Sequence, residues 1–315
     1  MPFDPKKFIP KSVQEIKKQI GEESAICALS GGVDSFVAAT LVAKAIPNLQ
    51  AVYVDNGLMR KNETQKVQKA AKGAGIKLTV IDARKRFLEG LKGISEPEAK
   101  RKMIGKLFID IFQEEAKKAK FLVQGTIAPD WIESGGMGRD TIKSHHNVGG
   151  LPEGMHLKLC EPLRELYKHE VRMIASELGL GEEIAQRQPF PGPGLGVRVV
   201  GEITEEKVRI VQDACEIVEI ELEKAAKEGK MEKPWQYFAA LLPSKTVGVR
   251  GDERAYQYTV VVRAVRSLDG MTASFSQVPF EVLEKISTRI TNEIRTVGRV
   301  VYDITNKPPG TIEME

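Results

Sequence analysis

The chain has 315 residues, of which 42% are hydrophobic and 29% charged, which suits about two soluble globular domains. Its formal net charge of +4 permits anionic ligands such as nucleotides, but it is too small to favour a nucleic-acid-binding protein. Three widely separated cysteines without a CxxC pair argue against a disulfide framework or a zinc site. No apolar run reaches about 18 residues and no signal-peptide pattern opens the chain, so we expect a cytoplasmic protein with no membrane partner.

Strands and helices alternate up to about residue 125. Short apolar runs bounded by glycine or polar residues indicate buried parallel strands, and segments with helical spacing follow them. The predicted strands are 24–29, 50–56, 77–83 and 121–126, and the predicted helices are 34–46, 62–75 and 95–120. Ser95 and Glu98 have capping-box spacing at the start of the last helix. Repeated βα units predict an α/β fold with a doubly wound parallel sheet.

The alternation stops after residue 126. Residues 127–154 are polar and rich in glycine, which predicts a functional loop or lid. A strand (155–163) and a helix (164–179) follow, and then "QRQPFPGPGLG", whose prolines and glycines exclude the interior of a helix or strand. We place the domain boundary there, giving domains of residues 1–190 and 191–315.

The second domain has a different pattern. Its strands and helices are grouped rather than alternating, which predicts a smaller α+β domain. The predicted helices are 204–228 and 279–296, and the predicted strands are 245–251, 256–266 and 299–305.

The string "SGGVDS", Ser30–Ser35, lies between a predicted strand and a predicted helix, where N–H groups and the helix dipole can bind phosphate. Gly31 and Gly32 let the backbone approach an anion, and the serines add hydroxyl groups. A tight βα turn with Asp34 as the helix cap is the alternative. The string lacks the GK[ST] ending of a Walker A loop, so chemistry at the γ-phosphate is not indicated.

Acidic residues follow two other predicted strands. Asp55 ends the second strand, at the edge of an α/β sheet where the adenosine end of a nucleotide would bind; a simple strand-ending turn is the alternative. Asp130 and Glu133 lie three residues apart after the fourth predicted strand. Carboxylates near phosphates suit Mg²⁺, although a capped helical turn explains the same spacing.

Two further segments carry candidate ligand-binding residues. Lys143 lies in the glycine-rich loop, where it could neutralise a phosphate leaving group on a closing lid; a solvated basic loop is the alternative. The ending "KPPGTIEME" has a rigid proline pair flanked by charged residues. An ordinary tail would be frayed and featureless, so this one is expected to hold a defined shape.

"SGGVDS" resembles the PP-loop of the ATP pyrophosphatases, which cleave ATP between the α- and β-phosphates. Further strings resemble the GMP synthase family within that class, in the same order and over nearly the whole chain. They are "VDNGLMR", "KRKMIG", "QGTIAPDWIES", "IKSHHNVGGLPE", "EPLRELYKHEVR", "RQPFPGPGLGVR", "VGVRGDERAY", "LDGMTA", "RVVYDIT" and "KPPGTIE". One departure is Met314, where tryptophan is usual.

The resemblance implies an adenine nucleotide α-hydrolase-like PP-loop domain that makes GMP from XMP, ATP and ammonia through an adenylyl-XMP intermediate. It implies Asp34, Asp130 and Lys143 as catalytic residues, and Asp130 with Glu133 as ligands of Mg²⁺. The implied ATP-binding residues are Ser30, Gly31, Gly32, Val33, Asp34, Ser35, Val54, Asp55, Gly125 and Thr126. The implied XMP-binding residues are Arg254, Lys307, Ile312 and Glu313.

The resemblance also implies partners. The C-terminal domain is expected to form a homodimer. No glutaminase domain precedes the PP-loop, so ammonia is expected either from a separate glutamine amidotransferase subunit or as free ammonia.

Two alternative functions remain. One is another PP-loop ATP pyrophosphatase, either similar to ammonia-dependent NAD synthetase or tRNA-thiolating; thiolation predicts catalytic cysteines or a metal cluster near the loop, and the spacing offers neither. The other is a non-catalytic nucleotide-binding subunit. Such a protein would not need Asp34, Asp130, Lys143 and an ordered tail together.

Overall fold

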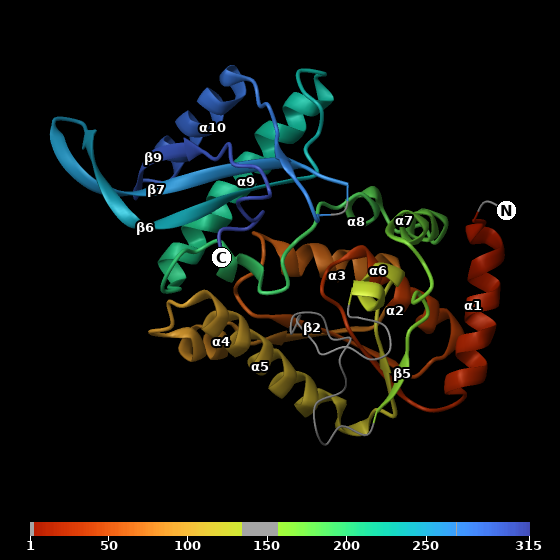
Figure 1. Ribbon diagram of the computed structural model, residues 1–315. Coiled ribbons are helices and arrows are strands. Elements are labelled where there is room, and N and C mark those ends of the chain that lie inside the picture. The colour runs from red at the N-terminus through yellow and green to blue at the C-terminus, as the bar shows by residue number, and fades with distance from the viewer. Residues whose placement is uncertain (1–2, 134–156, 269) are drawn as a thin grey trace. The chain divides into compact units, whose positions relative to one another are not determined.

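The computed structural model describes residues 3–133, 157–268 and 270–315, without the side chains of 131–133 (Figure 1). Internal contacts divide the chain into two units. The N-terminal unit comprises residues 1–55, 62–83 and 105–187, and the C-terminal unit comprises residues 56–61, 84–104 and 188–315. No helix in the described part of the chain is both long and apolar enough to span a membrane.

The N-terminal unit is built on a five-stranded, all-parallel sheet with the order β3-β2-β1-β4-β5. Its strands are β1 (Ala25–Ala28), β2 (Leu49–Asp55), β3 (Leu78–Asp82), β4 (Phe121–Val123) and β5 (Lys158–Cys160). The chain runs from β1 outward through β2 to β3 and then returns to the other side of β1 with β4 and β5. The strand order therefore reverses between β1 and β4, and in sheets of this kind ligands bind at the carboxyl ends of the strands beside such a reversal.

The N-terminal unit also contains several helices. They are α1 (Pro5–Ile20), α2 (Val33–Ala45), α3 (Glu63–Gly73), the 3₁₀ turn η1 (Ala116–Lys118), α6 (Ala128–Glu133), α7 (Lys168–Glu177) and α8 (Glu182–Ala185). Helix α5 (Pro97–Glu115) contributes to both units. Most residues of α2 are buried, because α1 and α7 cover the helix on the side away from the sheet. The predicted α/β fold class is confirmed.

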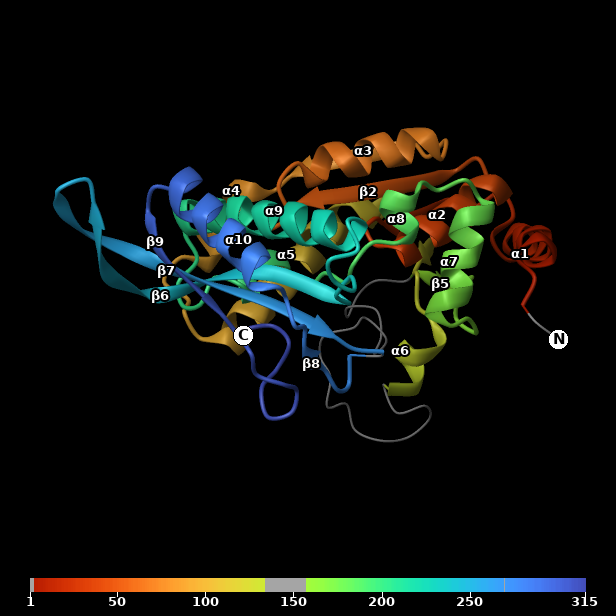
Figure 2. The same ribbon diagram turned by 90° about the horizontal axis from the view of Figure 1, so that it is seen from above.

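The C-terminal unit groups its strands and helices, as the sequence predicts. Its elements are α4 (Arg84–Leu91), the 3₁₀ turn η2 (Gly194–Val197), α9 (Glu205–Lys227), β6 (Gln236–Arg250), β7 (Glu253–Arg266), β8 (Ser274–Phe275), α10 (Phe280–Glu293) and β9 (Val297–Tyr302). Strands β6 and β7 form a long antiparallel hairpin, and β7 also pairs antiparallel with β8 and parallel with β9. Figure 2 shows the free end of this hairpin extending beyond the rest of the sheet.

The core of the C-terminal unit follows from the sequence of α9. Its buried residues include Val208, Val211, Cys215, Val218 and Leu222, which recur every three or four positions and form one apolar stripe. This stripe packs on β6, and α10 packs beside α9 and on β9. Both helices therefore cover the same face of the sheet.

Candidate active site

The PP-loop, Ser30–Ser35, connects β1 to α2 at the strand-order reversal. Gly31 has a φ of 83°, in the left-handed region that favours glycine. Gly32 is the N-cap of α2, and no side chain of the described residues caps this end of the helix. The Ser35 hydroxyl donates to the Gly32 carbonyl at 2.9 Å and lies 3.2 Å from the Ser30 hydroxyl. A helix N-terminus with adjacent hydroxyl groups suits a phosphate ligand.

A buried ion pair supports this loop. Arg187, which follows α8, donates from Nη1 to the Gly31 carbonyl at 2.7 Å and pairs through Nη2 with the carboxylate of Glu63. Glu63 is only 2% exposed. A β-carbon at Gly31 would lie 2.7 Å from Glu63 Oε1, so the pair leaves room only for glycine there. Arg187 and Glu63 therefore fix the conformation of the PP-loop.

Asp34 lies in the first turn of α2, within the PP-loop. Its Oδ2 accepts a hydrogen bond of 2.5 Å from Lys168 Nζ at the start of α7. Its Oδ1 is buried and has no hydrogen-bond partner in the described part of the chain. Asp34 is not the N-cap of α2, since Gly32 holds that position. The carboxylate therefore has one oxygen paired with a cation and one oxygen that can accept a further ligand.

The predicted nucleotide-binding residues on β2 lie at the carboxyl end of that strand. Asp55 is the last residue of β2, and its Oδ2 accepts from the hydroxyl of Thr64 on α3 at 2.8 Å. Val54, beside it, is buried. Since β2 neighbours β1 in a parallel sheet, the end of β2 lies on the same edge as the PP-loop.

The segment after β4 packs directly against the PP-loop. A β-carbon at Gly125 would lie 2.8 Å from the carbonyl carbon of Asp34 and 3.0 Å from its oxygen, so the two backbones are in close contact. Thr126, the next residue, is buried. Asp130 Oδ2 accepts from the Ile127 N–H at 3.0 Å, which stabilises the start of α6. The ends of β1, β2 and β4 thus place the predicted ATP-binding residues along one edge of the sheet.

Two of the predicted site residues cannot be placed. Lys143 lies outside the described residues, and the side chain of Glu133 is not described. Their predicted roles in charge neutralisation and Mg²⁺ binding therefore remain predictions.

The described residues allow a test of whether Mg²⁺ suits the site. Mg²⁺ typically takes one or two protein carboxylates together with phosphate oxygens and water. Asp34 supplies a buried carboxylate oxygen without a partner, and Asp130 follows the neighbouring strand. No group of three or more His, Cys, Asp or Glu residues that could hold a metal occurs in the part of the chain that the structure describes. This donor set suits an ion that is also held by a nucleotide, rather than an all-protein metal site.

In the C-terminal unit, the predicted XMP-binding residues fall into two places. Lys307, Ile312 and Glu313 lie on the carboxyl-terminal tail, residues 303–315. Lys307 pairs its backbone with Ala273, and its Nζ donates to the Gly270 carbonyl at 2.8 Å. Both oxygens of Glu313 accept from Arg198, at 2.9 and 3.0 Å. The tail therefore has the defined shape that its sequence predicts.

Arg254 does not lie on the tail but on strand β7. It lies near the start of β7, is exposed, and pairs with Val249 close to the free end of the β6–β7 hairpin. Both views show this end of the hairpin well away from the C-terminus (Figures 1 and 2). The structure thus brings three of the four predicted XMP-binding residues together and leaves the fourth apart.

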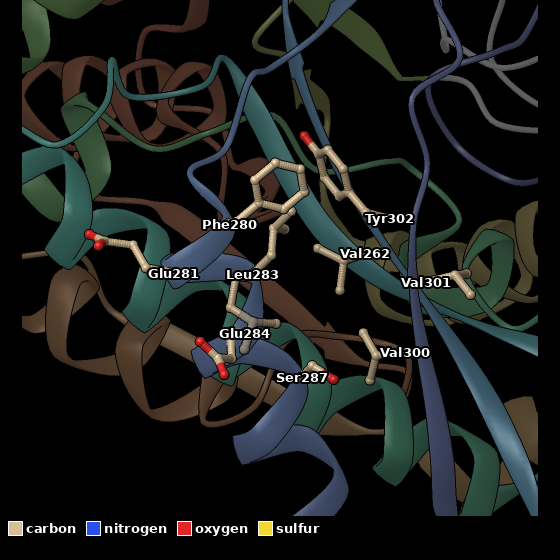
Figure 3. A pocket seen from close by; sticks show the side chains of 10 residues that line it. Val262, Phe280, Glu281, Leu283, Glu284, Ser287, Val300, Val301 and Tyr302 are labelled. Carbon is tan, nitrogen blue, oxygen red and sulfur yellow. The ribbon is translucent and has the colours of Figure 1, made fainter.

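A surface pocket of about 490 Å³ lies between α10 and β9. Phe280, Leu283, Val301 and Tyr302 are among its lining residues (Figure 3). None of the predicted site residues whose side chains the structure describes lines this pocket. It is therefore distinct from both groups of candidate ligand-binding residues.

Sequence reasoning missed several residues that contact the candidate sites. Lys168 and Arg187 lie in strings that carry the family resemblance, but their partners in the PP-loop are more than 130 residues away in the sequence. Arg198 ends the string "RQPFPGPGLGVR" and Arg263 lies in β7, and nothing local in the sequence indicates that both bind the tail. An arginine within the strongly apolar run of β7 was the one available signal, because an unpaired buried charge is costly.

Comparison with known proteins identifies the family. The chain is 59% identical to a subunit of the glutamine-hydrolyzing GMP synthase of Methanocaldococcus jannaschii, and the match covers 99% of this chain and 100% of that protein. It belongs to the GMP synthase family. The corresponding GMP synthase subunit from Thermococcus kodakarensis is also 59% identical, over 98% of this chain and 99% of that protein.

One of two matching family models and a further relative agree with membership of the GMP synthase family. The model "GMP synthase C terminal domain" matches residues 223–314, and the model "Queuosine biosynthesis protein QueC" matches residues 24–118. The GMP synthase of Lactobacillus delbrueckii subsp. bulgaricus is 55% identical over 98% of this chain and 60% of its own length. Among solved structures, an NMN synthetase from Francisella tularensis is 19% identical with a TM-score of 0.47, covering 66% of this chain and 85% of that chain.

Proposed function

We propose that this chain synthesises GMP from XMP, ATP and ammonia. The carrying observation is the PP-loop at the strand-order reversal, in a chain that matches the M. jannaschii relative over its full length. The GMP synthase family and the PP-loop support ATP as the co-substrate. The relatives that match nearly the whole chain are GMP synthases, which favours this function over the alternatives weighed from the sequence.

In the first step, the C2 oxygen of XMP attacks the α-phosphorus of ATP, and pyrophosphate leaves with the electrons of the broken P–O bond. The N-terminus of α2 and the hydroxyls of Ser30 and Ser35 stabilise the departing pyrophosphate. Lys168 supplies a cation beside Asp34. The residues at the ends of β2 and β4, including Asp55 and Thr126, position the rest of the nucleotide.

In the second step, ammonia attacks C2 of the adenylyl-XMP, and AMP leaves with the former C2 oxygen, giving GMP. Mg²⁺, when bound, neutralises charge on the phosphates. Asp130, with Glu133 or Asp34, would hold this ion, and the unpartnered Oδ1 of Asp34 is a suitable ligand atom. Lys143, on the segment after α6, would stabilise charge that develops on the phosphates.

We assign XMP to the C-terminal tail. Glu313 already binds Arg198 through both carboxylate oxygens, so its main chain is better suited than its side chain to contact a ligand. The N–H groups of Ile312 and Glu313 have no acceptor within the described residues, and Lys307 Nζ has further protons to donate. N–H donors beside an ammonium group suit the 5′-phosphate of XMP.

We also propose a homodimer formed through the C-terminal domain, residues 191–315, with residues 1–190 as the ATP-pyrophosphatase domain. Arg254 lies near the free end of the β6–β7 hairpin, and Figures 1 and 2 show that end away from the C-terminus. If it binds XMP, a second copy of the chain must bring it to the tail, which supports the dimer. A separate glutamine amidotransferase subunit, consistent with the name of the M. jannaschii relative, supplies ammonia in the cytoplasm.

The proposal is tested by incubating the purified chain with ATP, Mg²⁺, XMP and ammonium and measuring pyrophosphate, AMP and GMP. We expect equal amounts of the three products, and none when XMP is left out. Glutamine alone should give no GMP until ammonium or a glutaminase is added. Release of pyrophosphate that does not depend on XMP would overturn the proposal.

A further inference from the structure

The most buried cationic side chains in the described part of the chain all contact the same segment. Lys100, Arg198 and Arg263 are each at most 1% exposed. They come from α5, from the segment after η2 and from β7, and all three contact the carboxyl-terminal tail, residues 303–315. Each pairs with a different acidic residue of the tail: Lys100 with Glu315, Arg198 with Glu313 and Arg263 with Asp303.

Arg263 makes the largest set of these contacts. Its Nη1 donates to Asp303 Oδ2 at 2.7 Å and to the Thr305 carbonyl at 3.0 Å. Its Nη2 donates to the Thr311 carbonyl and its Nε to the Ile312 carbonyl, both at 2.8 Å. One guanidinium group therefore holds both ends of the segment that contains Lys307.

These bonds act on the main chain of the tail. With the carbonyls of Thr311 and Ile312 bound to Arg263, the peptide planes that carry the N–H groups of Ile312 and Glu313 are fixed in orientation. These are the N–H groups assigned to XMP in the proposed function. The side chain of Arg263 is itself fully buried, so it shapes the site without direct access to a ligand.

Lysine cannot replace this residue. An ammonium group has three donors around one nitrogen, whereas the planar guanidinium reaches four acceptors in fixed directions. Burying a charge is costly unless it is paired and hydrogen-bonded, and hydrophobic residues of similar volume often stabilise a fold as well or better. Among the described residues, the buried guanidinium of Arg263 hydrogen-bonds only to the tail. An arrangement this costly suits fixing the conformation of the tail better than adding stability to the fold.

We infer that Arg263 is a positioning residue for substrate binding: it holds residues 305–312 in the conformation that receives XMP. Arg198 has the same role for Glu313, with Gln236 donating to the same carboxylate at 2.7 Å. This inference rests on the proposed function for its ligand, but the effect of Arg263 on the tail can be measured without any ligand.

The first measurement is hydrogen exchange of the tail in the ligand-free full chain. The Lys307 N–H donates to the Ala273 carbonyl and the Gly310 N–H to the Asn306 carbonyl, so both amides report on the docked tail. In Arg263→Lys these amides should exchange at least about tenfold faster, since hydrogen bonds to a charged group are lost. The matched control is Arg266→Lys, on the same strand, where the arginine is half exposed and lies 3.6 Å from Glu232. In this control variant, the Lys307 and Gly310 amides should exchange at the wild-type rate.

The second measurement is steady-state kinetics of pyrophosphate release. Arg263→Lys should raise the KM for XMP by about tenfold or more, while the KM for ATP changes by less than about twofold, because only the tail is perturbed. If this variant does not fold, Asp303→Asn keeps the size of the side chain, weakens the same contact and should raise the KM for XMP by a smaller factor.

The outcomes separate the inference from the proposed function. A folded Arg263→Lys with wild-type exchange and a wild-type KM for XMP would overturn the inference, as would equal increases in both KM values. If the wild type releases no XMP-dependent pyrophosphate, the proposed function fails and the assignment to XMP fails with it. The exchange rates would still decide whether Arg263 fixes the tail.

Discussion

The close approach of two backbones beside the PP-loop leads to a quantitative prediction. Gly125 follows β4, and its α-carbon faces the peptide that joins Asp34 to Ser35. A β-carbon there would lie 2.8 Å from the Asp34 carbonyl carbon and 3.0 Å from the Ser35 nitrogen. Ordinary van der Waals contacts begin at 3.4 Å, so Gly125→Ala must move one of the two backbones by several tenths of an ångström.

The size of the effect follows from the atoms involved. The atoms that a β-carbon at position 125 would meet are backbone atoms in the first turn of α2, which is largely buried. The clash therefore cannot be relieved by rotation of a flexible side chain. Overpacking of this kind costs about 1–3 kcal/mol in unfolding free energy. For a domain of this size, each kcal/mol lowers the melting temperature by roughly 2–4 °C. Since the displaced turn carries Asp34 and Ser35, the KM for ATP should also rise by at least about tenfold.

Gly105→Ala is the matched control. Gly105 lies inside α5, and a β-carbon there would meet no atom of the described residues within 4 Å. Alanine in a helix interior is more stable than glycine by about 0.5–1 kcal/mol, so this variant should melt at a higher temperature with an unchanged KM for ATP. Thermal unfolding and pyrophosphate release measure both quantities. A Gly125→Ala variant as stable as the wild type, with a normal KM for ATP, would refute the close packing of β4 against the PP-loop.

Three further predictions concern charged and titratable groups. Lys168→Ala should change the unfolding free energy by less than about 1 kcal/mol, since its pair with Asp34 is partly exposed. The same variant should lower the rate of pyrophosphate release at least about tenfold, and Lys168→Arg should recover part of that rate. Equal rates in the wild type and both variants would contradict the role of this cation. Burial raises the pKa of Cys27 to about 12 and that of Cys160 to about 11. A thiol reagent at pH 8 should therefore leave all three buried cysteines unmodified and the activity intact until the chain is unfolded. Rapid inactivation of the folded chain would instead favour thiolate chemistry. Hydrogen bonds from two backbone N–H groups lower the pKa of Glu96 at the start of α5. The stabilising effect of this carboxylate is therefore present above pH 4.5 and lost as the pH falls through the lowered pKa. Glu96→Gln should reduce the dependence of urea unfolding on pH in that range, and an unchanged dependence would rule out this contribution.

The fold could be predicted largely because its signals are local. The glycine-bounded apolar strands and the amphipathic helices of the N-terminal unit carry their periodicity within short windows of sequence. The ends of elements were less well predicted. Strand β6 begins at Gln236 rather than near residue 245, because its first half is a continuous buried run without alternation. At α5 the predicted capping pair was Ser95 and Glu98, whereas the carboxylate of Glu96 accepts the N–H groups of the first turn.

The candidate sites were predicted where one string holds the whole arrangement, as in the PP-loop. They were missed where partners are distant in sequence. Arg187 supports Gly31 from 156 residues away, and Arg198 binds Glu313 across 115 residues. Nothing in a single sequence indicates which surface-like cation becomes buried against which loop, since that depends on how the elements pack. The same limit applies to Arg254, which the structure separates from the tail.

The fate of the C2 oxygen of XMP tests the proposed function most directly. XMP labelled with ¹⁸O at C2 is incubated with the chain, ATP, Mg²⁺ and ammonium, and the AMP is analysed by mass spectrometry. Adenylylation of that oxygen, followed by displacement with ammonia, predicts one ¹⁸O atom in the phosphate of each AMP for each GMP formed. AMP without the label, formed together with GMP, would contradict the adenylyl-XMP intermediate and the role assigned to the PP-loop.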